Sequence, residues 1–392
     1  MMTRADRGLL AEWWWTIDRT LLVAFLALIS IGMIMSFAAS PSVAERIGLD
    51  AFYFTRRHGV FALGAVLLLI ATSYLTPKLV RRLALLMLMG SIVMTIVVLA
   101  AGVEVKGSRR WVSVLGISIQ PSEFLKPGFV IICAWLFAEG RRHKEVPGNL
   151  LASVLVMVVC VLLLAQPDVG QTMLVTAVWG LMFFMAGMSW FWVILLGALG
   201  SAGLAGAYYT LDHVTQRINR FLTGEGDNFQ VDTATEAIVS GGWLGRGPGE
   251  GTVKDVLPDS HTDFVFAVIA EEFGIVLCFV LVLLFAFVVM RGLHHALRER
   301  DDFTRLAVSG LAMLFALQAI INMGVNLKLL PAKGMTLPFI SSGGSSMLAM
   351  AIGMGMLLAL SRRRPDHLAK RRMAENFRPL DVSFSQERGG VI

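Results

Sequence analysis

The sequence predicts an all-α integral membrane protein with about ten transmembrane helices, and three observations support this fold class. Hydrophobic residues make up 56% of the chain and charged residues only 16%, whereas a soluble domain carries about 25% charged residues. About ten apolar runs come close to the roughly 20 residues that a helix needs to cross a bilayer. The three cysteines all lie inside apolar runs, which excludes a disulfide-based fold.

The apolar runs follow one another with polar connections between them. In chain order they cover 20–38, 59–75, 83–102, 122–138, 149–165, 170–187, 190–209, 264–290, 303–327 and 344–361. The sixth and seventh are separated only by the turn Gly187-Met188-Ser189. Between the seventh and eighth we expect one long loop, 210–263, which contains a short interfacial helix near 234–239.

The distribution of basic residues predicts the orientation. Most lysines and arginines fall in segments on the same side as the N-terminus, and basic residues concentrate on the cytoplasmic side. Both termini are therefore predicted to be cytoplasmic, with a tail at 1–19, a transmembrane domain at 20–361, its large extracytoplasmic loop at 210–263, and a basic tail at 362–392 that we expect to be disordered. Basic residues in short loops and tails favour membrane lipids as partners and argue against nucleic acid.

Four polar clusters that contain a proline precede the fourth, sixth, eighth and tenth helices. They lie at 120–123, 166–168, 257–263 and 337–346. Even-numbered helices all begin on one side, which the charge distribution makes extracytoplasmic. Ordinary helix-start chemistry explains any one cluster, with Pro in the first turn and Ser or Asp as a cap. Four clusters together gather carboxylates near lipid, where charged groups are costly and mark functional sites, so we expect the chemistry at this face.

Two of the clusters contain charged residues with two interpretations each. Glu123 and Lys126 are three residues apart on one helix face, so they form either a buried structural ion pair or a polar patch where Lys126 meets a phosphate. Asp168 either caps the sixth helix or contributes to the same site.

The third cluster carries the most informative acid. Ser260 and Asp263 fit a capping box, but Asp263 also ends a long loop and begins an embedded helix, where a carboxylate borders both a hydrophilic substrate and the lipid. Glu271 and Glu272 lie about two turns further on. We expect a structural role for them, with an arginine or a buried hydroxyl as a partner.

Nucleotide and metal motifs are absent from the sequence. It contains no Walker motif, no GxGxxG, no HExxH and no clustered Cys/His set. The glycine-rich stretch 245–249 follows no predicted strand and is interpreted as a turn. The residues therefore require no cofactor and predict no metal site, although they leave open whether a divalent cation assists the reaction.

The four clusters resemble, in order and spacing, the motifs of the SEDS family (shape, elongation, division and sporulation). The most specific match is His261-Thr262-Asp263-Phe264 followed by Glu271-Glu272-Phe273-Gly274, and the resemblance covers about 20–361. Lys333-Gly334 is more similar to the division branch than to the elongation branch. The resemblance implies a peptidoglycan glycosyltransferase that polymerises lipid II outside the bacterial cytoplasmic membrane, at the division septum. It also implies a class B penicillin-binding protein as transpeptidase partner, together with other division-complex membrane proteins.

The resemblance also implies roles for single residues. Asp263 is the expected catalytic carboxylate, and nearby cations are suited to the pyrophosphate of the substrate. The expected substrate-binding residues are Glu123, Lys126, Asp168, Arg217, Arg220, His261, Lys333, Ser341 and Ser345. Two other functions stay open: a transporter or flippase for a lipid-linked precursor, and a non-catalytic division scaffold.

Overall fold

The computed structural model describes residues 8–46, 48–105, 108–114, 117–210, 214–216, 219, 229–331 and 334–362. The chain divides into two compact units, one made of Met1–Thr16 with Arg362–Ile392 and the other of Ile17–Ser361. In the first unit, helix α1 (Leu9–Thr16) ends where Nε of Arg362 donates a hydrogen bond to Oγ1 of Thr16 at 2.9 Å. The second unit holds the remaining described elements.

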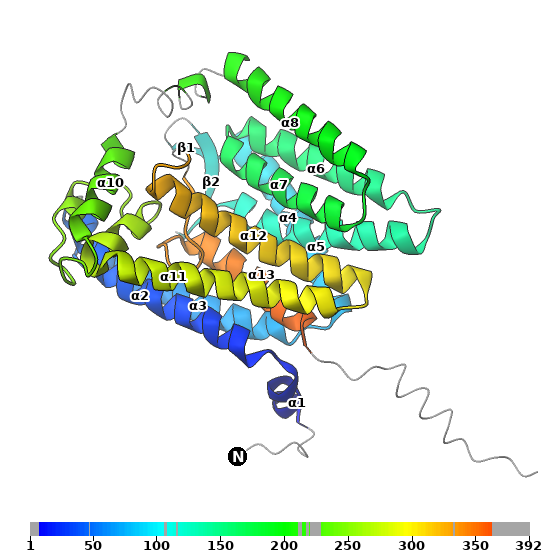
Figure 1. The fold of residues 1–392 in the computed structure, drawn as a ribbon, viewed down its shortest axis with the longest axis horizontal. Coiled ribbons are helices and arrows are strands. Elements are labelled where there is room, and N and C mark those ends of the chain that lie inside the picture. The colour runs from blue at the N-terminus through cyan, green and yellow to red at the C-terminus, as the bar shows by residue number, and fades with distance from the viewer. Residues whose placement is uncertain are drawn as a thin grey trace, which may run out of the picture. The chain divides into compact units, whose positions relative to one another are not determined.

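Each predicted apolar run overlaps one helix of the second unit (Figure 1). These helices are α2 (Arg19–Arg46), α3 (Tyr53–Ser73), α4 (Pro77–Ala101), α5 (Pro121–Arg142), α6 (Gly148–Ala165), α7 (Val169–Met185), α8 (Trp190–Thr210), α11 (Val265–Arg298), α12 (Asp302–Asn326) and α13 (Gly344–Leu360).

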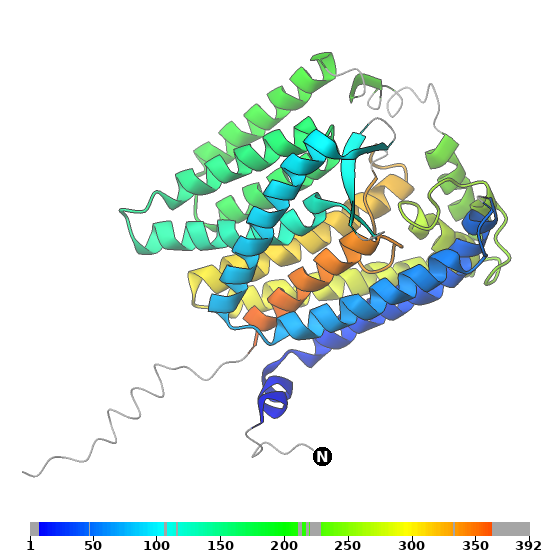
Figure 2. The ribbon, with the colours of Figure 1, turned by 180° about the vertical axis from the view of Figure 1, so that it is seen from behind.

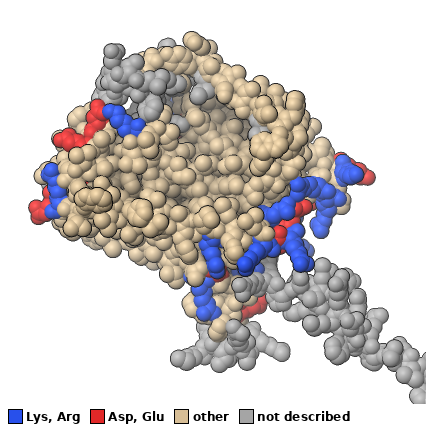
Figure 3. Space-filling model, in the orientation of Figure 1, with Lys and Arg blue, Asp and Glu red and all other residues tan. Residues whose placement is uncertain are grey.

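The described part of the chain contains eight helices that are long and apolar enough to cross a membrane: α2, α3, α4, α5, α6, α8, α11 and α12. Helices α7 and α13 are apolar but shorter. Figure 3 shows one face of the molecule, where a broad band lacks charged side chains and the lysines, arginines and acids gather at the margins. A mostly helical membrane protein is thus confirmed.

A small β-sheet between α4 and α5 corrects the all-α expectation. Strands β1 (Val103–Val105), β2 (Ser108–Val114) and β3 (Ile117–Ile119) pair antiparallel in the order β1-β2-β3. Trp111 pairs with Val103 across the first ladder. The three strands are short and rich in β-branched residues, which favour an extended backbone.

Helices α5 and α12 form the centre of the second unit. Buried positions make up 83% of the apolar segment of α5 and 72% of that of α12, against 28% in α6 and none in α8. Helix α12 packs against α5, α7, α11 and α13, while α8 contacts α7 at the edge (Figures 1 and 2). The polar groups carried by α5 and α12 therefore lie inside the protein.

The segment that precedes α11 is partly helical. Helix α10 (Phe229–Gly241) confirms the short helix predicted near 234–239 and packs against α11. A 3-10 turn, η1 (Val253–Asp255), follows. Gly245, Gly247 and Gly249 all have positive φ, which confirms that this stretch is a turn.

Helix α11 is broken at Gly274, and the turn before it repairs the break. Gly274 has φ 80° and ψ 174°, so the N–H groups of residues 275 and 276 cannot reach the carbonyls of Glu271 and Glu272. Instead they donate to the carbonyls of residues 242 and 243 at 3.0 and 3.2 Å. The carbonyls of Glu271 and Glu272 accept from the N–H groups of residues 246 and 247 at 2.9 and 3.0 Å. All four backbone groups stay hydrogen-bonded, as a membrane segment requires.

Candidate functional site

Hydrogen bonds join the first two polar clusters to α12. Oδ1 of Asp168 accepts from the N–H of Gln171 at 3.2 Å, and the side-chain amide of Gln171 donates to Oε1 of Glu123 at 2.9 Å. Oε2 of Glu123 lies 2.8 Å from Nζ of Lys126, which donates to Oε1 of Gln318 at 3.1 Å. We call these five residues the polar network.

The predicted pairing of Glu123 with Lys126 is confirmed, and the pair is covered. The side chains of Lys126 and Glu123 are 3% and 6% exposed, and the space that remains between α5, α12 and α13 is too small for a water molecule. A buried ion pair is tolerated when its other polar atoms are hydrogen-bonded, and Gln171 and Gln318 supply those bonds. A phosphate could therefore reach Lys126 only if α5 and α12 moved apart.

Asp168 caps α7, as its position before that helix predicted, and it also has an ionic partner from the sheet. Nη1 of Arg110 on β2 lies 3.4 Å from Oδ2 of Asp168. Burial raises the pKa of Asp168, and the charge of Arg110 opposes this effect. Arg110 also donates to the carbonyls of Gln166 and Pro167 at 3.0 and 2.6 Å. The sheet is thus attached to the second polar cluster.

Asp263 lies in a turn before α11 and does not form the predicted capping box. The N–H groups of residues 262–264 all donate to the carbonyl of Asp259, at 3.0 to 3.3 Å. The N-cap position belongs to Phe264, which makes no side-chain cap, and Oγ of Ser260 is buried with no hydrogen-bond partner among the described residues. The capping box is wrong because the helix begins later than the sequence pattern indicated.

Asp263 is half-buried, and hydrogen bonds to its carbonyl fix the backbone that carries it. A Cβ at Gly334 would stand 3.3 Å from Oδ2 of Asp263. The Asp263 carbonyl accepts from the side-chain amides of Asn322 and Asn326 at 2.9 and 3.0 Å. The Asp263 carboxylate is therefore carried by a fixed backbone and lies beside a glycine.

The third and fourth polar clusters contact each other directly. Oγ of Ser341 donates to the carbonyl of Thr262 at 2.5 Å, and the N–H of Ser342 donates to the carbonyl of His261 at 2.9 Å. The ring of His261 packs on that of Phe54 in α3, with centroids 4.6 Å apart. Burial lowers the pKa of His261, so its imidazole is favoured in the neutral form.

The fourth cluster also reaches the polar network. Nε2 of Gln318 lies 3.3 Å from the carbonyl of Thr336, and the Thr336 hydroxyl donates to Oγ of Ser346 at 3.1 Å. Ser345 is buried in the first turn of α13. All four polar clusters of the sequence therefore meet in one connected region.

Three predicted substrate-binding residues lie outside the described residues: Arg217, Arg220 and Lys333. Within the described ranges, no group of three or more His, Cys, Asp or Glu side chains could hold a metal ion.

Glu271 and Glu272 have structural partners, though not the arginine or hydroxyl that we expected. The carboxylate of Glu271 accepts from the N–H groups of residues 252–254 at 2.7 to 2.9 Å. Glu272 forms an ion pair with Lys254, whose ammonium also donates to the carbonyl of Ala38 at 3.1 Å. Both acids attach the loop that contains η1 to α11.

Sequence reasoning missed a row of amides on α12. Gln318, Asn322 and Asn326 follow one another at four-residue intervals on α12, and we call them the amide stripe. The interval places them on one helix face, and three amides in an apolar helix form a signal that the sequence contains.

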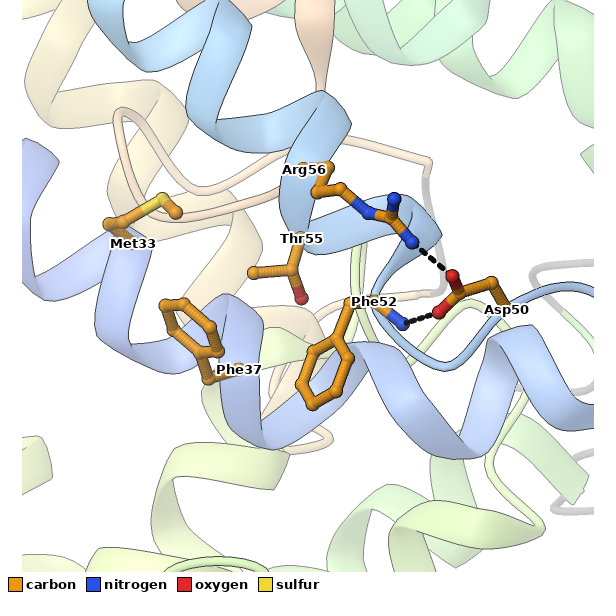
Figure 4. A pocket seen from close by; sticks show the side chains of 6 residues that line it. All are labelled: Met33, Phe37, Asp50, Phe52, Thr55 and Arg56. Carbon is orange, nitrogen blue, oxygen red and sulfur yellow. Dashed lines mark hydrogen bonds and ion pairs between the residues drawn. The ribbon is translucent and has the colours of Figure 1, made fainter.

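The described residues also line an apolar groove, which lies between α2 and α3. Its volume is about 440 Å³, and its walls are Met33, Phe37, Phe52 and Thr55. The ion pair of Asp50 with Arg56 lies at its edge (Figure 4). None of the predicted site residues lines this groove.

Comparisons with known proteins agree with the resemblance found in the sequence. The model of the FtsW/RodA/SpoVE family, described as cell cycle proteins, matches residues 19–365. A protein of Caulobacter vibrioides named probable peptidoglycan glycosyltransferase FtsW is 47% identical over 92% of this chain and 93% of its own length. An Escherichia coli protein with the same name is 35% identical over 88% of this chain and 85% of its own.

Two solved structures share the fold. A chain from a structure titled "Structural coordination of polymerization and crosslinking by a peptidoglycan synthase complex" superposes with a TM-score of 0.75 at 27% identity, covering 89% of this chain and 98% of that one. The rod shape determining protein RodA of Thermus thermophilus gives a TM-score of 0.67 at 27% identity, covering 90% and 99%. The extent of these matches, together with the four connected clusters, shows that the chain belongs to the FtsW/RodA/SpoVE family of cell cycle proteins.

Proposed function

We propose that the chain is a peptidoglycan glycosyltransferase that polymerises lipid II into glycan strands during septal cell-wall synthesis. The observation that carries the proposal is the hydrogen-bonded connection of four polar clusters, one of which contains Asp263, in a chain 47% identical to a relative named probable peptidoglycan glycosyltransferase FtsW. The protein acts in the bacterial cytoplasmic membrane, at the division septum.

The proposal includes ten membrane spans with both termini cytoplasmic. Helices α7 and α13 have 17 residues each, so each is about 26 Å long, close to the thickness of a thin bilayer. The distribution of basic residues supports cytoplasmic tails at 1–19 and 362–392. In this orientation the loop 210–263 and Asp263 face the outside, where no nucleotide is available and an activated lipid-linked donor needs none.

The carboxylate of Asp263 accepts the proton of the attacking sugar. In chain growth, the 4-hydroxyl of a GlcNAc forms a bond to the anomeric carbon of another sugar, and the bond from that carbon to the diphosphate oxygen breaks. The diphosphate leaves with the electron pair, and Asp263 takes the hydroxyl proton. General base catalysis of this kind contributes about 10²–10⁴-fold.

The remaining predicted residues bind the substrate around this acid. We assign the diphosphate to Arg217, Arg220 and Lys333, since cations stabilise a leaving phosphate through charge-assisted hydrogen bonds. The side of the site on which Asp263 lies also contains three other substrate-binding residues: His261, Ser341 and Ser345. Glu123, Lys126 and Asp168 act through the polar network, and contact with the substrate requires α5 and α12 to separate.

The proposal names partners and requires no cofactor. A class B penicillin-binding protein is the expected transpeptidase, a proposal supported by a structural neighbour described as part of a peptidoglycan synthase complex. Other division-complex membrane proteins and membrane lipids complete the expected partners. A divalent cation carried by the diphosphate stays compatible with this chemistry.

The test is Asp263→Asn in purified protein, assayed for glycan strands from lipid II in detergent. The substitution keeps the backbone hydrogen bonds to Asn322 and Asn326, so the protein should fold and insert but make no glycan. Asp259→Asn is the matched control: it lies in the same turn at φ 53°, where Asn is well tolerated, and should stay active.

Three outcomes separate the candidate functions. Polymerisation by Asp263→Asn at the wild-type rate would remove the catalytic assignment. A flippase would give no product in detergent, because detergent removes the two compartments between which a flippase moves its substrate. A scaffold would make no glycan and would tolerate the substitution in cells.

A further inference from the structure

The amide stripe of α12 is buried beside the acid. Gln318, Asn322 and Asn326 are 2%, 1% and 0% exposed. Burying an amide is unfavourable unless it is hydrogen-bonded, so three consecutive amides in a membrane helix need specific partners. Gln318 has its partners in Lys126 and Thr336, and the other two are directed at the start of α11.

Asn326 replaces a backbone hydrogen bond of α11. In a helix that included Asp263, the Asp263 carbonyl would accept from the N–H of Ala267, four residues later. Here Nδ2 of Asn326 donates to that carbonyl at 3.0 Å, and Oδ1 of Asn326 accepts from the N–H of Ala267 at 3.1 Å. The side-chain amide therefore lies between the two groups. The Ala267 N–H also donates to the carbonyl of Phe264 at 3.1 Å, so both groups are hydrogen-bonded while Asp263 stays outside the helix.

Asn322 connects the same carbonyl to the loop that faces the acid. Its Nδ2 donates to the carbonyls of Asp263 and Met335 at 2.9 and 2.6 Å. Met335 follows Gly334, the residue beside the Asp263 carboxylate. Through these two hydrogen bonds, the Asn322 amide fixes the distance between the turn that carries Asp263 and the segment at 334–335, which lies beside the carboxylate.

We propose that Asn326 and Asn322 are positioning residues: Asn326 keeps Asp263 out of the first turn of α11, and Asn322 holds the acid against the segment at 334–335. This inference rests on the proposed function, because the position of Asp263 matters only if its carboxylate reacts. Without Asn326, residues 263–267 can close into a regular helical turn, which reorients the carboxylate. A displacement of about 1 Å costs on the order of 10²-fold in rate.

The test uses Asn326→Leu, which keeps the branching of the side chain but removes its three hydrogen bonds: those to residues 263 and 267, and the one that its amide donates to the carbonyl of Asn322. The control is Ser309→Ala on the same helix, since Ser309 is equally buried and its hydroxyl donates to the carbonyl of Arg305 in its own helix. We measure the folded fraction by size-exclusion chromatography in detergent, then kcat and KM with lipid II, and the pH dependence of kcat.

For Asn326→Leu we expect kcat per folded molecule to fall about 10²-fold, with KM unchanged. The pH profile of kcat should shift, because the surroundings of the carboxylate change. Ser309→Ala should retain the wild-type values. A merely structural role would lower the folded fraction alone, so wild-type kcat and an unshifted pH profile in the folded Asn326→Leu protein would overturn the proposal.

Two further variants keep the inference falsifiable. If Asn326→Leu does not fold, Asn326→Ser and Asn322→Ser each remove a donor while keeping a small polar side chain, and the same comparison applies to them. Wild-type protein and Asp263→Asn are assayed alongside. If wild type makes no glycan, the proposed function fails and this inference falls with it. If wild type is active, Asp263→Asn inactive and the asparagine variants normal, this inference alone fails.

Discussion

Among the described residues, two buried ion pairs join a lysine to a glutamate, and they connect different parts of the protein. Glu123 and Lys126 lie three residues apart on α5 and belong to a network that crosses into α7 and α12. Lys254 and Glu272 lie 18 residues apart and attach a loop to α11. The first pair belongs to contacts between helices, whereas the second holds a loop against a helix. The same kind of ion pair therefore stabilises the polar network in one case, and in the other it stabilises the loop beside the broken helix α11.

The largest effect is expected from breaking the second pair. Lys254→Met leaves Glu272, whose side chain is 0% exposed, as a buried charge without its cation, which costs about 3–5 kcal/mol. The unfolding temperature in detergent should fall strongly. Lys328→Met is the matched control, since Lys328 pairs with Asp232 at the surface. Equal unfolding temperatures for the two variants would contradict the importance of burial.

A smaller effect is expected when the first pair is replaced as a whole. In Glu123→Gln with Lys126→Met, no charge remains buried and the introduced glutamine can still accept from Gln171, so only Gln318 loses a partner, at about 1–3 kcal/mol. The double variant should be more stable than Lys126→Met alone. Lipid II polymerisation then decides the role of Lys126: activity in the folded double variant shows a structural pair, and its loss supports contact with the substrate.

The exposed pair of Asp50 with Arg56 provides the lower limit of the comparison. The N–H of Phe52 and the guanidinium of Arg56 hold the pKa of Asp50 below its usual range, so this interaction is present at neutral pH and is lost as the pH falls through the lowered pKa. Solvent screens such a pair, so Arg56→Gln should leave the unfolding temperature at neutral pH unchanged. A clear decrease would mean that the groove edge matters for folding.

The first pair could be predicted from the sequence and the second could not, and the reason is general. The helices follow from apolar runs, and Glu123 with Lys126 follows from the spacing on one helix, because both signals are local. Lys254 meets Glu272 only after the loop has folded back onto α11, and no local pattern encodes that contact. The same limit applies to Asp263: its capping box is wrong, and the hydrogen bonds from Asn326, on a distant helix, are not encoded in the local pattern.

Two features lay within reach of the sequence but were missed. The sheet at 103–119 has alternating β-branched residues in short runs separated by Lys-Gly and Leu-Gly in the sequence, and its arginines obscured a pattern that is otherwise typical of a hairpin. The amide stripe shows a regular interval in an apolar helix. Their connections were not accessible: Arg110 reaches Asp168, and Asn326 reaches Asp263, across more than 50 residues of sequence.

The break at Gly274 has a consequence for how the protein is made. Synthesis delivers the turn at 241–247 before α11, so in the proposed orientation the turn is already translocated when α11 enters the bilayer. Helix α11 cannot by itself satisfy the carbonyls of Glu271 and Glu272, which accept from that turn. In that orientation, the helix that follows Asp263 is completed after insertion, from the outside, by a segment synthesised earlier.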